Sequence, residues 1–248
     1  MRNTMPCVGL IVLGGCLTFL VAPDEQPYFD SPPASLAFPV VVIDPGHGGN
    51  DDGARGNGLI EKDLTLDVAT RAEKLLKQFG FQTVLTRSDD TYVSLPERAA
   101  IANRIDNSIF VSIHFNHAYG GTGIETFYAT QKVPPEAAWT WVGFFNKPKP
   151  APTDNGETLA GFIQASMIMR TEATNRGIRG RPLYVVRHTR NPAALVECGF
   201  VSNPFEARLI ANTEYRDRLA KALAEGVMSY TKSRPRATPP PALAQAIH

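Results

Sequence analysis

Residues Val40–Gly49 read VVVIDPGHGG, and this stretch decides the fold. Its first four residues are β-branched without polar alternation, which is typical of a strand buried on both faces of a sheet. Asp44-Pro45-Gly46 ends this strand, because proline cannot donate to a central ladder. His47 is therefore expected just past the carboxyl end of the strand, where open α/β sheets bind their ligands. A histidine in a turn is also commonly structural, so its meaning depends on what ends the later strands.

Strand-like and helix-like patterns alternate along the rest of the chain. Further strands are predicted at 81–86, 108–114, 124–129, 183–187 and 193–197. Helices are predicted at 61–79, 94–103, 158–175 and 213–230, with a short one after Asn203. This alternation predicts a single α/β domain over residues 39–232, with a roughly six-stranded, mostly parallel sheet and helices on both faces.

The charge of the chain is nearly balanced, with 25 Lys and Arg against 24 Asp and Glu in 248 residues. No basic face or nucleic-acid-binding motif is recognisable, so nucleic acid is not expected as a partner. Only Cys198 lies in the predicted domain, so no disulfide can form within it. We expect the domain to act as a monomer stabilised by its core.

Residues 1–23 have the pattern of an export signal. Arg2 precedes the apolar segment Val8–Ala22, which is short for a transmembrane helix. The sequence Leu-Gly-Gly-Cys ending at Cys16 resembles a bacterial lipobox, so plain export and lipid anchorage of the N-terminus both stay open. We expect a protein of the bacterial periplasm or cell envelope, with a proline-containing tether over 24–38 and a disordered tail over 233–248.

Two other predicted strands end at side chains that could do chemistry. His114 ends the strand at 108–114, Glu197 ends the strand at 193–197, and Glu61 begins the helix that follows the loop after His47. These four residues can meet at one edge of the sheet. Two imidazoles and one carboxylate are the ligands of a catalytic zinc with an open position for water, and a second carboxylate could act as the general base. Residue types alone do not tell which glutamate is the ligand.

Simpler interpretations exist for single members of this set. Glu61 could serve only to interact with the helix dipole. Cys198 with His114 or His188 could indicate a thiol hydrolase, although its place after an apolar strand favours a small buried residue. No HExxH pair occurs in the sequence, so the helical metalloprotease arrangement is excluded.

Four motifs together resemble a known family. They are DPGHGG, the glutamate before KDLTLDVA, SIHFN and LVECGFVSN, in that order over nearly the whole domain. They are similar to the motifs of the zinc-dependent N-acetylmuramoyl-L-alanine amidases of bacterial cell separation and spore lysis. The resemblance implies that His47, Glu61 and His114 hold one zinc ion and that Glu197 is the catalytic base.

The resemblance also implies a substrate, peptidoglycan, and a reaction, hydrolysis of the amide between N-acetylmuramic acid and L-alanine. Asn116 matches a polar residue near the metal and is expected to orient substrate. Arg181 and Arg187 flank the predicted strand at 183–187, and Arg187 is a candidate for binding a peptide carboxylate. Regulated members carry a helix that occludes the zinc, but the prolines of residues 130–156 argue against such a helix here.

Two other functions fit the same residues. A non-catalytic peptidoglycan-binding protein of the envelope would use the aromatic residues of 130–156 and the N-terminal anchor. Another zinc amidohydrolase would share the chemistry and differ in the amide that it cleaves.

Overall fold

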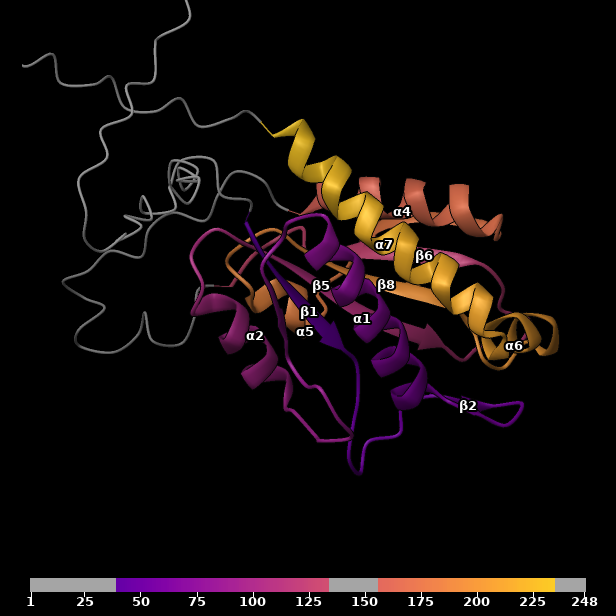
Figure 1. Cartoon of the computed structure of the whole chain (residues 1–248). Helices are drawn as coiled ribbons and strands as arrows, with labels where there is room; N and C mark the ends of the chain where they lie inside the picture. Colours follow the sequence, from indigo (N-terminus) through magenta and orange to yellow (C-terminus); the bar gives the residue numbers. More distant parts are fainter. Residues whose placement is uncertain (1–38, 134–155, 235–248) are drawn as a thin grey trace, which may run out of the picture.

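The computed structural model describes residues 39–133 and 156–234, which form one α/β unit (Figure 1). The strands of its main sheet are β1 (Val40–Pro45), β4 (Thr83–Leu85), β5 (Ser108–Asn116), β6 (Ile124–Tyr128), β7 (Asn175–Gly180) and β8 (Ala193–Phe200). The helices are α1 (Glu61–Gln78), α2 (Leu95–Asn103), α4 (Glu157–Thr171), α5 (Tyr184–His188), α6 (Pro204–Ala211) and α7 (Thr213–Ser233). A two-stranded hairpin of β2 (Arg55–Gly56) and β3 (Leu59–Ile60) precedes α1.

The six strands lie in the order β4-β1-β5-β8-β6-β7. The first four are parallel, and β6 pairs with β8 in the antiparallel sense, while β7 is parallel to β6. The carboxyl ends of β1, β5 and β8 therefore share one edge of the sheet with the amino ends of β6 and β7. The predicted class, a mixed α/β domain with a mostly parallel six-stranded sheet, is confirmed.

Helices cover the sheet unequally on its two faces. Helices α1, α4 and α7 pack against one face, and the shorter α2 and α5 pack against the other (Figure 1). Along α1 the buried apolar residues Leu64, Val68, Ala72 and Leu76 recur at helical spacing, which turns one stripe of the helix toward the sheet. Among the described residues, the second face is thus covered by shorter helices than the first.

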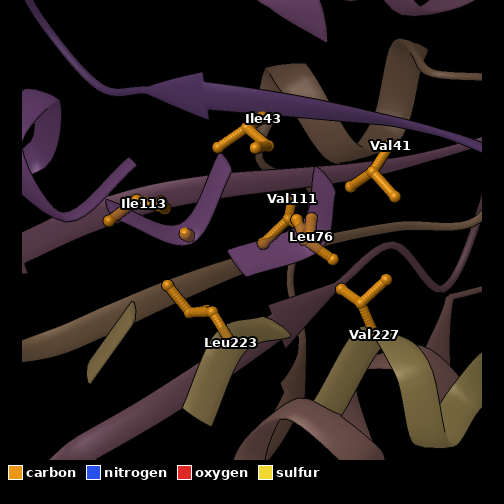
Figure 2. A pocket seen from close by; sticks show the side chains of 8 residues that line it. Val41, Ile43, Leu76, Val111, Ile113, Leu223 and Val227 are labelled. Atoms are coloured by element: carbon orange, nitrogen blue, oxygen red, sulfur yellow. The ribbon is translucent and has the colours of Figure 1, made fainter. Parts of the chain in front are cut away.

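The larger core is closely packed. Figure 2 shows Val41, Ile43, Val111 and Ile113 of β1 and β5 facing α1 and α7, around a gap of about 10 Å³. A gap of this size is at the lower limit for one water molecule. The strands that lead to the predicted metal centre are thus packed on one face against α1 and α7.

Local sequence signals place most helix ends where they were predicted. Ser94 caps α2 by accepting a hydrogen bond from Glu97 N at 3.4 Å, and Asn203 caps α6 through Phe205 N at 2.9 Å. Side chains of this kind satisfy amide groups that the first helical turn leaves without a partner.

The prediction of a strand at 183–187 is wrong, because residues Tyr184–His188 form the short helix α5. A brief apolar run such as Leu-Tyr-Val-Val fits either structure. The helical turn brings the rings of Tyr184 and His188 into a stack with centroids 3.8 Å apart and buries Val185 and Val186.

The sixth strand is instead β7, whose sequence NRGIRG lacks a continuous apolar run. As the edge strand of the sheet it is largely exposed, so its sequence does not carry the pattern of a buried strand. The helix predicted at 158–175 accordingly ends earlier, at Thr171, and Glu172 takes the left-handed conformation with φ 56°.

Several predictions concern residues outside the described ranges: the export signal, the tether, most of residues 130–156 and the C-terminal tail. They stay predictions. Among the described helices none is long and apolar enough to cross a membrane.

Candidate metal centre and active site

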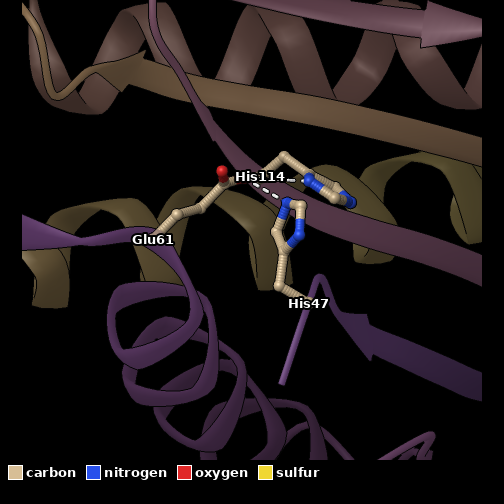
Figure 3. Close-up of side chains that lie close together, drawn as sticks. All are labelled: His47, Glu61 and His114. Carbon is tan, nitrogen blue, oxygen red and sulfur yellow. Dashed lines mark hydrogen bonds and ion pairs between the residues drawn. The ribbon is translucent and has the colours of Figure 1, made fainter. Parts of the chain in front are cut away.

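Three side chains meet where the loop after β1 and the carboxyl-terminal part of β5 approach the start of α1 (Figure 3). Glu61 Oε1 lies 3.1 Å from His47 Nε2 and 2.9 Å from His114 Nδ1. One nitrogen or oxygen atom from each of the three residues lies within 4.8 Å of the others. The two imidazole rings stand edge to face, with centroids 5.0 Å apart. Among the described residues this is the group that could hold a metal ion.

The charges of this group favour a shared cation. Burial would raise the pKa of Glu61, but hydrogen bonds with His114 and His47 outweigh it and hold the pKa well below its ordinary value. Burial would lower the pKa of His47, but Glu61 and Asp51 raise it above its ordinary value. The Glu61 carboxylate therefore stabilises positive charge between the two rings. A divalent ion can supply this charge while both imidazoles stay unprotonated. The donor set fits a metal of the zinc type.

The second oxygen of Glu61 is fixed by the backbone. Oε2 accepts a hydrogen bond from Ala54 N at 2.6 Å, while Oε1 also accepts one from Phe115 N at 2.9 Å. Glu61 is only 3% exposed, so its carboxylate has little freedom to turn toward solvent. The glutamate is thus held in the orientation that faces both rings.

His47 occupies a turn that two buried arginines support. His47 has φ 61°, which is uncommon for a residue other than glycine. Arg98 donates from Nη2 to His47 O at 2.7 Å and from Nη1 to Pro45 O at 2.6 Å. Arg87 donates from Nη2 to Gly46 O at 2.8 Å. These bonds fix three consecutive carbonyl groups and stabilise the unusual backbone of His47.

Asp44 neutralises Arg98 beneath the turn. Its Oδ1 accepts from Arg98 Nη1 at 2.7 Å and from Thr86 Oγ1 at 2.6 Å, and its Oδ2 accepts from Ser112 Oγ at 2.7 Å. Asp44 is fully buried and Arg98 is 2% exposed. A buried ion pair of this kind needs such additional hydrogen bonds to offset desolvation.

Asp51 orients the ring of His47. Its Oδ2 lies 2.8 Å from His47 Nδ1, so Nδ1 donates and Nε2 is left to face Glu61 and His114. Carboxylates that bond the far nitrogen of a ligand histidine fix its tautomer and raise its basicity. Asp51 therefore selects the nitrogen that points into the group.

Gly46 and Gly53 allow the rings to approach the backbone. A Cβ at Gly46 would lie 2.3 Å from His114 Cε1, and one at Gly53 would lie 2.5 Å from Glu61 Oε2. Neither position has space for a larger residue, so both glycines are part of the packing around the group.

Glu197 lies beside the group on the neighbouring strand. It pairs in register with His114 across β5 and β8, so both side chains are on the same face of the sheet. The residue keeps some solvent exposure, but its Oε2 is enclosed and has no hydrogen-bond partner among the described residues. Burial raises the pKa of Glu197 from 4.5 to about 7. An unpaired buried carboxyl of this pKa can both accept and donate a proton near neutral pH.

A cavity lies beside the turn that carries His47. Its volume is about 270 Å³, and it is lined by Asp44, Gly46, His47, Asp51, Tyr92, Val93, Leu95, Arg98, His114 and Val185. Tyr92 and Leu95 are about half exposed at its rim. Among the described residues, His47 and His114 therefore line a cavity next to the exposed side chains of Tyr92 and Leu95.

The remaining candidate residues, Asn116 and Arg187, are not members of this group. Asn116 is at the end of β5, two residues after His114, and no hydrogen bond of its side chain is found among the described residues. Arg187 is in α5 rather than beside a strand, and its buried Nε has no partner in the part of the chain that is described. Both stay predicted substrate contacts.

Cys198 faces the opposite side of the sheet, in the core under α1, α4 and α7. It is fully buried, and burial raises the pKa of its thiol well above the ordinary value. A buried thiol with a raised pKa is a poor nucleophile. This excludes the thiol-hydrolase interpretation.

Sequence reasoning missed the supporting shell of charged residues. Arg87 and Arg98 are buried under the His47 turn, where Arg98 is paired with Asp44. Asp51 lies four residues after His47, and this spacing could have suggested its contact with the His47 ring. Glu125, which pairs in register with Glu197, carried no signal, because a lone acid in an apolar strand has no recognisable partner.

This fold and site define a class of protein, an α/β domain that gathers a potential metal-binding group and a separate buried carboxyl at the carboxyl ends of its strands. The chain belongs to the N-acetylmuramoyl-L-alanine amidase family, whose model matches residues 41–229. The resemblance inferred from the four motifs is thereby confirmed.

Individual relatives agree with this assignment. The chain is 35% identical to the N-acetylmuramoyl-L-alanine amidase LytC of Bacillus subtilis over 77% of its own length, but it spans only 35% of LytC. It is 30% identical to the germination-specific N-acetylmuramoyl-L-alanine amidase of the same organism, over 79% of this chain and 81% of the relative. A crystal structure of an N-acetylmuramoyl-L-alanine amidase from Clostridium difficile superposes with a TM-score of 0.67 at 38% identity, covering 80% of this chain and 99% of that one.

Proposed function

We propose that this protein hydrolyses the amide between N-acetylmuramic acid and L-alanine in peptidoglycan, with His47, Glu61 and His114 holding one zinc ion. The observation that carries the proposal is the enclosed carboxyl of Glu197, unpaired and in register with His114, beside three side chains that could bind a metal. The names of the relatives indicate which amide is cleaved.

Each residue of the site has a defined part in this reaction. Zinc supplies a Lewis acid that polarises the amide carbonyl and makes water more acidic. Glu197 takes the proton from the attacking water and passes it to the leaving nitrogen, which its pKa of about 7 permits. Asn116 and Arg187 bind substrate. Asp51 and Arg98 hold His47 in place.

The protein would act outside the cytoplasm, on the cell wall. The apolar segment Val8–Ala22 supports export, and cell-wall amidases among the relatives support the same location. Acylation of Cys16 would add a lipid anchor.

The test is digestion of purified sacculi by the zinc-loaded chain, with the products identified by mass. We expect free stem peptides that begin with L-alanine. Glu197→Gln should lower the rate by about 10²- to 10⁴-fold while zinc content stays at one ion per chain. Glu61→Gln should lose the zinc. The exposed Glu97→Gln is the matched control and should change neither quantity.

Each other function predicts a different result. A wall-binding protein would sediment with sacculi and release nothing. A different zinc amidohydrolase would give products of other masses. Full activity of Glu197→Gln would contradict the role of this residue as the base.

A further inference from the structure

A row of charged side chains continues from Glu197 toward the edge of the sheet. Glu125 of β6 pairs in register with Glu197, and Phe127, two residues further along, pairs with Arg179 of β7. Residues two apart on a strand share a face, so Glu125 and Arg179 lie on the same face as Glu197. The row crosses three adjacent strands and begins at the proposed general base.

Two arginines contact one buried carboxylate in this row. Glu125 is 4% exposed, and its Oε1 lies 2.5 Å from Arg179 Nε, while its Oε2 lies 3.5 Å from Arg176 Nε. One carboxylate neutralises only one guanidinium, so the cluster keeps one net positive charge. A buried acid with two cationic partners leaves that positive charge at the surface.

The free parts of both guanidinium groups reach solvent. The Arg179 side chain is 49% exposed and that of Arg176 is 32% exposed. Arg176 also donates from Nη1 to Thr122 O at 3.3 Å and lies 5.1 Å above the ring of Phe200. Among the described residues, Arg179 Nη1 and Nη2 and Arg176 Nη2 have no acceptor. Planar pairs of N–H groups fixed in this way match the two oxygens of a carboxylate.

We infer that Arg176 and Arg179 bind a carboxylate of the substrate's peptide, two or three residues from the amide that is cleaved. This inference rests on the proposed function. Strands in a sheet lie about 4.8 Å apart, so two strand spacings separate the strand of Glu197 from that of Arg179, roughly 10 Å. An extended peptide spans at most about 3.5 Å per residue, so it covers this distance in two to three residues. Glu125 contacts both guanidinium groups but neutralises only one of them.

The site makes the enzyme selective for a charged peptide. A stem peptide with a free carboxylate at this distance is preferred over the same peptide with an amide there. The discrimination arises in the binding of the peptide and leaves the proton transfer at Glu197 unchanged.

The test compares two synthetic N-acetylmuramoyl peptides that differ only in this group, one with a free carboxylate on the second residue and one with a carboxamide. For the zinc-loaded wild-type chain we expect kcat/KM to be about tenfold higher for the acid, the effect of one charge-assisted hydrogen bond. Arg179→Gln should reduce the ratio of kcat/KM for the acid to kcat/KM for the carboxamide to about one. Arg170→Gln breaks an Arg–Glu ion pair with Glu225 in α7 and should leave the ratio unchanged.

Glu125→Gln provides a test in the opposite direction. This variant keeps both arginines and removes the negative charge that they share. The ratio of kcat/KM for the acid to kcat/KM for the carboxamide should therefore rise above the wild-type value. A purely structural role of the cluster would lower both rates equally and leave the ratio unchanged. If Arg179→Gln does not give folded protein by circular dichroism, the Glu125→Gln variant still tests whether the two arginines bind the carboxylate.

The two proposals fail in distinguishable ways. Equal hydrolysis of both peptides by the wild-type chain, or an unchanged ratio in folded Arg179→Gln, refutes the carboxylate site alone. Hydrolysis of neither peptide refutes the proposed function and this inference with it.

Discussion

Replacing Glu197 by glutamine should change how the stability of the metal-free protein depends on pH. Burial raises the pKa of Glu197 from 4.5 to about 7, so between these pH values the folded state holds a proton that the unfolded chain has released. The stabilisation from this neutral carboxyl is complete below pH 4.5 and is lost as the pH rises through 7. Each pKa unit corresponds to about 1.4 kcal/mol, so the loss is at most about 3.5 kcal/mol, and partial exposure of the residue reduces it.

The assay is urea unfolding of wild type and Glu197→Gln at pH values from 4.5 to 8 in the presence of a chelator. In the difference between the two unfolding free energies, the contributions of titratable groups that both proteins share cancel. Relative to the variant, the wild type should lose up to about 3.5 kcal/mol across this range. Glu97→Gln, which removes an exposed carboxylate, should follow the wild-type curve.

Zinc provides a further check on the same residue. A nearby cation favours the charged carboxylate and lowers its pKa, so the pH dependence of the difference should shrink when zinc is added. A wild-type minus variant difference that stays constant from pH 4.5 to 8 without metal would refute the conclusion that Glu197 is buried as a neutral acid.

Three other perturbations test the shell around the site. Arg98→Met leaves Asp44 buried without its cation and should cost about 3–5 kcal/mol in urea unfolding, and an unchanged midpoint would contradict the network. Asp51→Ala removes the partner of His47 Nδ1 and should weaken zinc binding about 10- to 100-fold in a competition assay with a fluorescent chelator. Gly46→Ala places a methyl group 2.3 Å from His114 Cε1, so zinc binding and activity should fall together although the far-ultraviolet circular dichroism spectrum is retained.

Much of the sheet could be predicted because its central strands are uniformly apolar. Val40–Pro45, Ser108–Asn116 and Ala193–Phe200 are buried on both faces, and a continuous β-branched or apolar run is the direct consequence in the sequence. The helix Glu61–Gln78 was predictable for a similar reason, since its buried residues recur at helical spacing.

The edge strand of the sheet, β7, was not predictable in the same way. Asn175–Gly180 is an exposed edge strand and needs no apolar run, while the apolar run at Tyr184–His188 is one helical turn. Short segments of this kind take the conformation that their neighbours in space impose, so local sequence does not determine them.

By itself the sequence determined the four candidate side chains of the centre. The positions of His47, Glu61, His114 and Glu197, each next to the end of a strand or the start of a helix, predicted that they meet, but the choice of Glu61 as ligand and Glu197 as base came from the resemblance of the four motifs. The tertiary structure decided which groups support them. Arg98 under the His47 turn and Glu125 beside Glu197 are brought there by strand register and helix packing, and such long-range contacts leave no local pattern in a single sequence. The pKa of Glu197 depends on this enclosure in the same way, since burial is a property of the folded chain.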